Sequence, residues 1–158
     1  MITIITGEKD TGKSSFLRKW YESVPRGIGF YSRKVFCHSR LIGYDLVFLP
    51  GFQTFPLIRL PEWAAAGELR VEGIRKGRFS FSPVGFRLAR QWIGAYAIPG
   101  EPVWIDEVGG LELAGGGFDG LIRQVLLAHQ DVRMVFRKHL LEKLVAHYAI
   151  EKYQVIRF

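Results

Sequence analysis

One stretch near the start of the chain decides the expected fold: Gly7, Glu8, Lys9, Asp10, Thr11, Gly12, Lys13, Ser14 and Ser15. It fits the pattern Gly-x-x-x-x-Gly-Lys-Ser/Thr, whose glycines allow backbone N–H groups to turn inward around phosphates. In this pattern the lysine reaches the β- and γ-phosphates and the serine hydroxyl binds Mg²⁺. The sequence therefore predicts a nucleotide-binding loop, with Lys13 as a catalytic cation and Ser14 as a metal ligand.

The residues around this stretch supply the strand and the helix that such a loop needs. Residues 1–6 are apolar and β-branched, which favours a strand, and residues 13–22 carry apolar side chains at helical spacing. A helix that begins at the loop adds positive potential to the phosphate site. Lys9 and Asp10 occupy positions where small residues are common, and the negative charge of Asp10 predicts a modest affinity for phosphates.

A second candidate part of the site is the run Val103 to Glu107, a hydrophobic strand with two adjacent carboxylates at its carboxyl end. We expect Asp106 to bind Mg²⁺ through water. Successive side chains of a strand point to opposite sides, but the chain turns where a strand ends. Glu107 is therefore expected to face the γ-phosphate and to orient the attacking water as a general base.

Strands and helices alternate through the second half of the chain. We expect helices over 83–96, 118–129 and 138–148, and strands over 102–108, 132–136 and 152–158. Residues 28–36 and 41–49 predict a β-hairpin, and residues 51–81 predict small strands and loops without a helix. The prediction is an α/β fold of three layers, with a mainly parallel central sheet, an inserted β-hairpin region and ligands at the carboxyl ends of the strands.

In P-loop proteins with an Asp-Glu strand end, another strand lies between the phosphate-loop strand and the acidic strand. Residues 132–136 are the candidate for this central strand, which gives a RecA-like strand order. Arg137 would then lie close to the γ-phosphate, where a cation stabilises the transition state. Arg33 is a weaker candidate for the same role.

Composition limits the classes of protein that remain. The 158 residues predict a single domain over 1–158, and every hydrophobic run is too short to span a bilayer. The single cysteine, Cys37, predicts a cytoplasmic protein without an internal disulfide. The net charge of +7 favours anionic partners, nucleotides or nucleic acid, and the basic segment from Arg70 to Phe81 fits a nucleic-acid surface, a phosphate-closing lid or a solvated hairpin.

Residues 105–113, Ile-Asp-Glu-Val-Gly-Gly-Leu-Glu-Leu, resemble the Asp-Glu-Ile-Gly-x-Met-Glu signature of a small P-loop nucleoside-triphosphatase family that includes cancer-related and thermophile enzymes. Residues 29–33 and 42–46 are similar to two further segments of that family. The resemblance implies hydrolysis of several nucleoside triphosphates to the diphosphate and phosphate with Mg²⁺. It extends to Gly7, Gly12, Lys13, Ser14, Asp106, Glu107 and Glu112; the departures are Lys9-Asp10 and Gly110-Leu111.

Two other functions stay open at this point. A nucleotide or small-molecule kinase would use the same loop, although a group that activates water wastes triphosphate in a kinase. A nucleotide-dependent module that binds RNA or protein, with slow turnover, fits the positive charge. The chain contains no Asn-Lys-x-Asp run for reading guanine, so that a guanine-selective GTPase is disfavoured. The oligomeric state is not encoded in any of these patterns.

Overall fold

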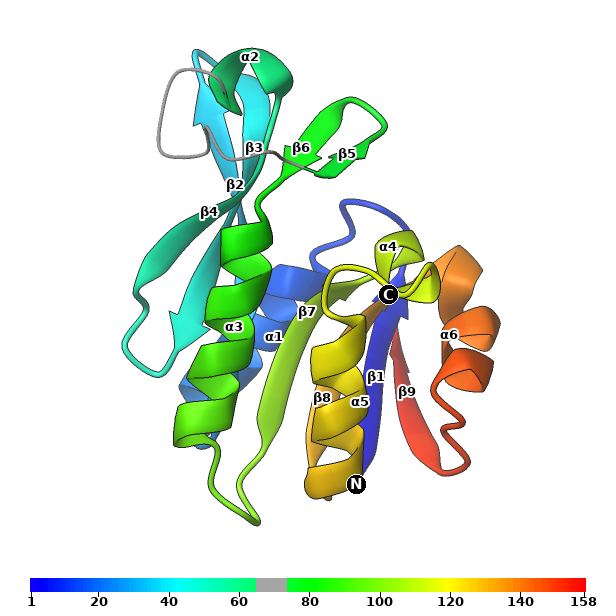
Figure 1. Ribbon diagram of the computed structural model, residues 1–158. Helices are drawn as coiled ribbons and strands as arrows, with labels where there is room; N and C mark the ends of the chain where they lie inside the picture. Colours follow the sequence, from blue (N-terminus) through cyan, green and yellow to red (C-terminus); the bar gives the residue numbers. More distant parts are fainter. Residues whose placement is uncertain (65–73) are drawn as a thin grey trace.

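The apolar and β-branched runs of the sequence form one sheet in the order β5-β6-β4-β3-β2-β7-β8-β1-β9 (Figure 1). The structure is a computed structural model that describes residues 1–64 and 74–158. Within these ranges the strands are β1 (Ile2–Gly7), β2 (Ile28–Cys37), β3 (Arg40–Leu49), β4 (Thr54–Arg59), β5 (Ile74–Lys76), β6 (Phe79–Phe81), β7 (Val103–Val108), β8 (Val132–Arg137) and β9 (Tyr153–Arg157). The helices are α1 (Lys13–Ser23), α2 (Pro61–Ala64), α3 (Pro83–Tyr96), α4 (Gly110–Leu113), α5 (Asp119–Ala128), the 3₁₀ turn η1 (Lys138–Leu140) and α6 (Leu141–His147).

The strands that alternate with helices form the parallel part of the sheet. β8 lies between β1 and β7 and pairs in parallel with both. β2 pairs in parallel with β7, and β9 with β1. The predicted central position of residues 132–136 is therefore confirmed, together with the RecA-like order.

The predicted hairpin begins an antiparallel extension of the same sheet. β2 and β3 pair around the turn residues His38 and Ser39, whose φ angles of 46° and 65° fit a type I′ turn. β4, β6 and β5 continue the antiparallel pairing. The insertion is thus larger than one hairpin, and the sheet as a whole is mixed.

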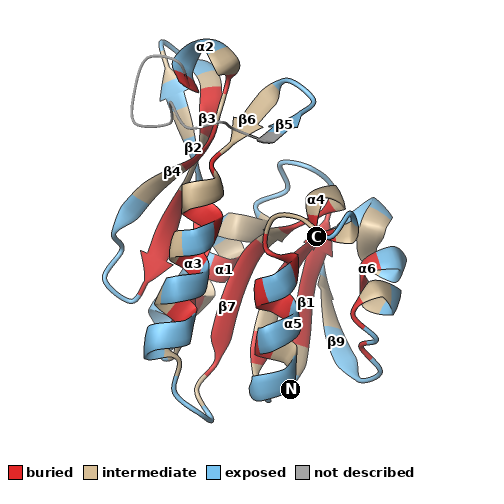
Figure 2. Cartoon of the chain, viewed as in Figure 1, coloured by how far each residue is buried: buried red, intermediate tan, exposed pale blue. Residues whose placement is uncertain are grey.

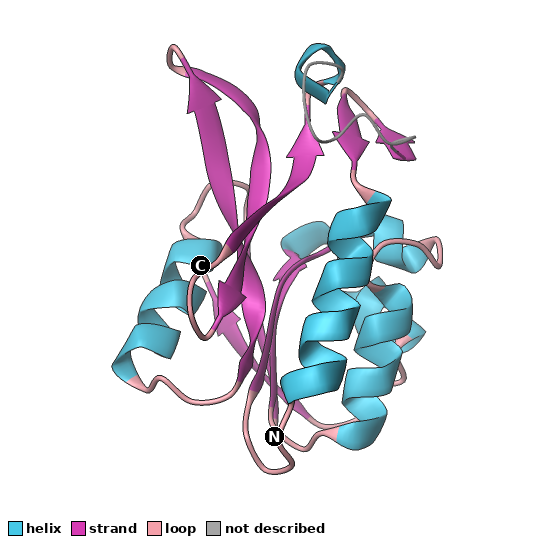
Figure 3. Cartoon of the chain, turned by 60° about the vertical axis from the view of Figure 1, so that its left-hand side comes forward, coloured by secondary structure: helices cyan, strands magenta, loops and turns pink. Residues whose placement is uncertain are grey.

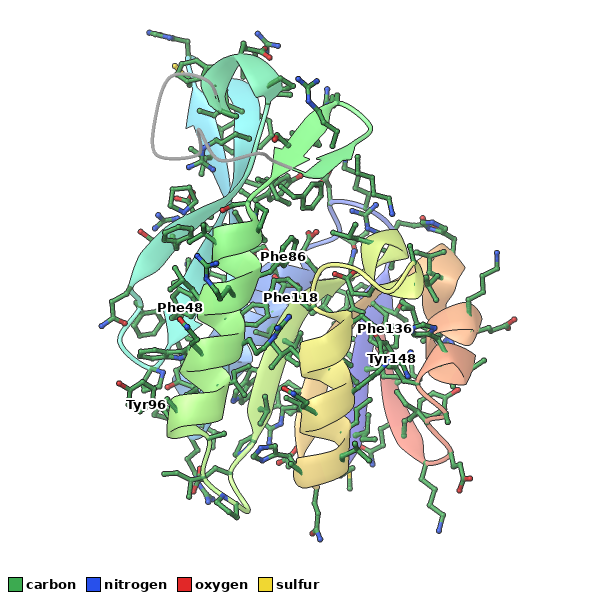
Figure 4. All side chains as sticks on the ribbon, in the orientation of Figure 1. Phe48, Phe86, Tyr96, Phe118, Phe136 and Tyr148 are labelled. Carbon is green, nitrogen blue, oxygen red and sulfur yellow. The ribbon has the colours of Figure 1, made fainter. Side chains whose placement is uncertain are left out.

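Helices cover both faces of the parallel part and complete the three predicted layers (Figure 3). α1 packs on one face through Leu17 and Tyr21, in a cluster around the fully buried Trp104. α3, α5 and α6 cover the other face. There Phe86 of α3 and Phe118, directly before α5, point toward each other, with ring centroids 4.7 Å apart (Figure 4). β1 and β7, enclosed between these layers, are buried along most of their length (Figure 2).

Two short helices differ from the expectations. α2 lies within residues 51–81, where only strands and loops were expected, and α4 follows the bend at Gly109. Each has four residues, and one turn is too short to show helical periodicity in a sequence. Residues 65–73, which include Arg70, lie outside the described part of the chain. None of the helices in the described ranges has the length and hydropathy of a membrane span.

Candidate functional site

The loop of residues 7–15 joins the carboxyl end of β1 to the amino end of α1, as predicted. Gly12 has a φ of 90°, a left-handed conformation that glycine adopts without strain. A Cβ on Gly7 would lie 2.9 Å from Thr11 Oγ1 and 2.8 Å from the Cβ of Phe158. The backbone of the loop therefore requires both glycines.

Side chains of the loop form hydrogen bonds with the backbone of the same loop. Thr11 Oγ1 donates a hydrogen bond to the carbonyl oxygen of Glu8 over 2.9 Å. The ammonium group of Lys13 donates to the same carbonyl and lies 3.5 Å from Thr11 Oγ1. The Lys13 side chain is thus folded back over the loop. Phosphate oxygens, as charged acceptors, would bind this ammonium more strongly than the neutral carbonyl does.

The two acidic residues of β7 lie in a β-bulge. The register with β8 shifts between Ile105 and Val108, so that Asp106 and Glu107 together oppose a single residue of β8. Glu107 has a φ of 64°, which is rare for a residue other than glycine. The expected strand over 102–108 is present as β7, with the two acids near its carboxyl end. Within this bulge the Asp106 carboxylate faces the N–H of Ser32, and the Glu107 carboxylate faces Arg137.

Asp106 is fully buried, and backbone groups hold its carboxylate. Its Oδ2 accepts a hydrogen bond from the N–H of Ser32 over 2.8 Å, and its Oδ1 accepts from the N–H of Glu107 over 2.9 Å. Burial raises the pKa of Asp106 well above its usual range, and the adjacent Glu107 carboxylate raises it further. The hydroxyl of Ser14 acts in the opposite direction. A buried carboxylate in this state is stabilised by a proton or by a bound cation.

Glu107 is more accessible than Asp106, with 32% of its side chain exposed. Its Oε2 lies 3.9 Å from Nη2 of Arg137, which stands at the carboxyl end of β8 as predicted. Partial burial raises the pKa of Glu107, whereas the positive charges of Arg137 and Lys13 lower it. Glu107 therefore combines access to water with a raised basicity, which suits a proton acceptor.

Ser14 and Asp106, the two predicted metal ligands, come from the first turn of α1 and from the bulge. A hydrogen bond from the Ser14 hydroxyl is among the causes that lower the pKa of Asp106. Both offer oxygen, the ligand atom that Mg²⁺ prefers, and Mg²⁺ in nucleotide sites needs few protein ligands because phosphates and waters complete its shell. In the described residues no three His, Cys, Asp or Glu side chains form a metal cage. The residues present thus fit a Mg²⁺ ion that binds together with a nucleotide.

Two other residues named from the sequence lie outside this cluster. Nη2 of Arg33 lies 3.4 Å from Oδ2 of Asp45, on the antiparallel extension, and not at the loop. Glu112 is buried, and its carboxylate accepts backbone N–H groups of Gly109 over 2.8 Å and of Phe118 over 3.2 Å. Glu112 therefore shapes the segment that follows the bulge.

Three residues that sequence reasoning did not single out also contact the loop or the acidic bulge. Ser32 binds the buried carboxylate through its backbone N–H. Lys34 Nζ lies 2.6 Å from Oδ1 of Asp10, and Lys138 Nζ lies 2.8 Å from Oε1 of Glu8. Because side chains alternate along β2, Ser32 and Lys34 lie on the same face of the strand. No local sequence pattern indicates that this face meets the site.

The described part of the basic segment forms the hairpin of β5 and β6, with Arg75, Lys76 and Arg78 exposed. Its aromatic rings face the protein. Phe79 lies 6.1 Å from the Tyr44 ring, and Phe81 is stacked on Phe86 at 6.2 Å. These two rings pack against the core, so that the aromatic half of the expected nucleic-acid surface has a structural role.

A phosphate-binding loop at the carboxyl edge of a parallel sheet, with an acidic strand two positions away, defines a nucleotide-binding P-loop protein. The sequence profile described as NTPase matches residues 2–158, and the chain belongs to this family of nucleoside triphosphatases. The cancer-related nucleoside-triphosphatase homolog of Bos taurus is 33% identical over 129 residues, which cover 77% of this chain and 67% of the relative. The resemblance noted from residues 105–113 is thereby confirmed.

Two solved structures share the fold. THEP1 from the hyperthermophile Aquifex aeolicus superposes with a TM-score of 0.73 at 20% identity, over 99% of this chain and 89% of THEP1. The solution structure of a human cancer-related nucleoside triphosphatase has a TM-score of 0.71 at 22% identity, over 98% of this chain and 87% of the human chain. At these identities the likeness concerns the fold alone.

Proposed function

We propose that the chain hydrolyses nucleoside triphosphates to the diphosphate and phosphate with Mg²⁺, and that it tolerates different bases. The observation that carries the proposal is the position of Glu107. Its carboxylate has a raised pKa, is partly open to water and lies 3.9 Å from Arg137, within the electrostatic influence of Lys13. These are the groups needed to prepare water beside a phosphate.

In the proposed reaction the water oxygen bonds to the γ-phosphorus while the bond from that phosphorus to the β–γ bridging oxygen breaks. Glu107 takes the proton of the water, and the diphosphate leaves with the bonding electron pair. Lys13 neutralises the β- and γ-phosphate oxygens, and Arg137 stabilises charge that develops on the transferred group. Mg²⁺ held by Ser14 and Asp106 would supply further neutralisation of the phosphate oxygens.

We favour hydrolysis over transfer to another acceptor because the chain belongs to a family of nucleoside triphosphatases. A carboxylate that activates water would also waste triphosphate in a kinase. Base tolerance is what the family resemblance implies, and the sequence has no Asn-Lys-x-Asp run for reading guanine. A cytoplasmic location stays a prediction from the single cysteine.

The test measures phosphate release from ATP, GTP, CTP and UTP, with Mg²⁺ and with EDTA, and measures nucleotide binding in parallel. We expect turnover of all four nucleotides and its loss in EDTA. Glu107→Gln should lower kcat by about 10²- to 10⁴-fold while nucleotide binding persists, because only proton transfer is removed. Arg137→Ala should lower kcat with a smaller effect on nucleotide binding. Lys13→Ala should lower kcat and also weaken nucleotide binding.

Binding without turnover in the parent would contradict this proposal. Faster diphosphate formation on addition of a hydroxyl acceptor would then identify a kinase. RNA or protein binding that differs between the diphosphate and triphosphate states would instead identify a nucleotide-dependent binding module.

A further inference from the structure

The loop carries two acidic side chains, each paired with a lysine from another element. Glu8 is paired with Lys138, directly after β8, and Asp10 is paired with Lys34 of β2. All four side chains are at least 41% exposed, and exposed ion pairs contribute little to stability. The consequence of these pairs is therefore positional: they hold two ammonium groups at the phosphate loop.

Lys34 is the better fixed of the two lysines because of how β2 is anchored. The N–H of Ser32 donates to Oδ2 of Asp106, which sets β2 against the acidic bulge. Side chains alternate along a strand, so Lys34 lies on the same face of β2 as Ser32. The intervening Arg33 lies on the opposite face and pairs with Asp45.

The Lys34 ammonium lies at the phosphate loop, and its strand is bonded to the acidic bulge. It contacts Asp10 in the loop, 2.6 Å from Oδ1. Two positions before Lys34 on β2, the N–H of Ser32 binds Asp106, the neighbour of Glu107 in the bulge. A triphosphate bound in the loop, with Glu107 activating water for its terminal phosphorus, places the γ-phosphate between Glu107 and Lys34.

We propose that Lys34 is a further γ-phosphate-binding residue, which Asp10 holds at the site before nucleotide arrives. The inference rests on the proposed triphosphatase function. An ammonium group has three donors, so Lys34 can keep its bond to Asp10 and donate another to a phosphate oxygen. Asp10, an acid at a position where small residues are common, then has a role of its own. It positions the Lys34 ammonium, which distinguishes a triphosphate from a diphosphate.

The test compares the binding of a non-hydrolysable triphosphate analogue and of the corresponding diphosphate, both with Mg²⁺. Lys34→Ala should weaken the triphosphate analogue about tenfold, as for one lost charge-assisted hydrogen bond, and leave the diphosphate within about twofold. Arg33→Ala, which removes a positive charge from the adjacent position on the outward face, is the matched control and should change neither affinity. Equal losses for both nucleotides, or no loss, would overturn the proposal.

A second variant separates positioning from simple charge. Asp10→Asn keeps Lys34 but removes its ionic partner, and we expect Lys34→Ala to weaken triphosphate binding less in the Asp10→Asn background than in the parent. Identical effects in both backgrounds would show that Asp10 does not position Lys34. Phosphate release is measured separately, so that a parent with γ-selective binding but no hydrolysis would refute the triphosphatase and leave the role of Lys34 standing.

Discussion

At the scale of single residues, the candidate site depends on side chains held in uncommon states. Asp106 is a fully buried carboxylate with a raised pKa, and Glu107 has a left-handed backbone with a φ of 64°. Each costs free energy in the folded chain. Strained and desolvated residues concentrate at functional sites, where the surrounding structure enforces them.

The backbone of Glu107 supplies a prediction that is independent of catalysis. In the left-handed region a Cβ costs about 1–2 kcal/mol, a cost that glycine avoids. Glu107→Gly should therefore have a free energy of unfolding about 1 kcal/mol higher than Glu107→Ala, measured by urea denaturation. Both variants lack the carboxylate, so that the comparison isolates the backbone.

The control for this comparison is Arg90, an exposed residue in the middle of α3. There Arg90→Gly should be less stable than Arg90→Ala, by about 0.5–1 kcal/mol, because glycine weakens a helix. If Glu107→Gly were also less stable than Glu107→Ala, residue 107 would not have a left-handed backbone in the bulge.

At the scale of elements, α5 and α6 are joined by a cluster of polar side chains around Asp119. Asp119 Oδ1 lies 2.7 Å from Nε2 of His147, and Asp119 Oδ2 accepts a hydrogen bond from Nε of Arg123 over 3.1 Å. Asp119 is 8% exposed, so these contacts replace most of its hydration. The cluster fixes α6, which begins directly after the turn that contains Lys138.

The pKa of Asp119 makes this contact dependent on pH. Burial raises it, but hydrogen bonds from His147 and Arg123 outweigh burial and hold the pKa below its ordinary value of 3.8. The folded state then binds the proton less well than the unfolded state, so the contribution to stability is present above pH 3.8 and is lost as the pH falls through the lowered pKa.

Asp119→Asn should accordingly lower the free energy of unfolding by about 1–2 kcal/mol at neutral pH. The difference from the parent should shrink in acid, below the ordinary carboxyl pKa. Urea denaturation at both pH values measures it, with Glu151→Gln, at an exposed carboxylate, as the control. A difference that stays constant with pH would contradict the assignment.

At the scale of the whole molecule, the site gathers residues from the carboxyl ends of neighbouring parallel strands. The loop follows β1, Arg137 ends β8, the acids lie near the end of β7, and Lys34 comes from β2 where the antiparallel extension begins (Figure 1). Several cationic side chains lie at this edge, and the chain as a whole has a net charge of +7. Such a field attracts an anionic nucleotide.

This charge predicts a dependence of substrate binding on salt. Raising the KCl concentration from about 20 to about 300 mM should increase KM for a nucleoside triphosphate several-fold, because ions screen the attraction, and should change kcat much less. Steady-state kinetics at constant free Mg²⁺ measure both quantities. Thermal unfolding in the same buffers checks that the fold is intact. A KM that does not vary with salt would show that the net charge does not assist binding.

Several features of the fold could be predicted because they depend on neighbouring residues. The loop pattern, the helix after it, the apolar strand before the two acids and the alternation of strands and helices all lie within short windows of sequence. α2 and α4 were missed because a single helical turn has no period to detect, whereas the small strands expected within residues 51–81 are present as β4, β5 and β6.

The sequence by itself determined the phosphate loop, the class of fold and the residues that the family resemblance names, because each rests on local pattern. The tertiary structure alone decided how they meet. Ser32 and Asp106 are separated by 74 positions, and Lys138 and Glu8 by 130. The bulge at Glu107 exists through the register of β7 against β8. Contacts of this kind depend on strand order and register, which pairing across the whole sheet sets, and no window of sequence contains them.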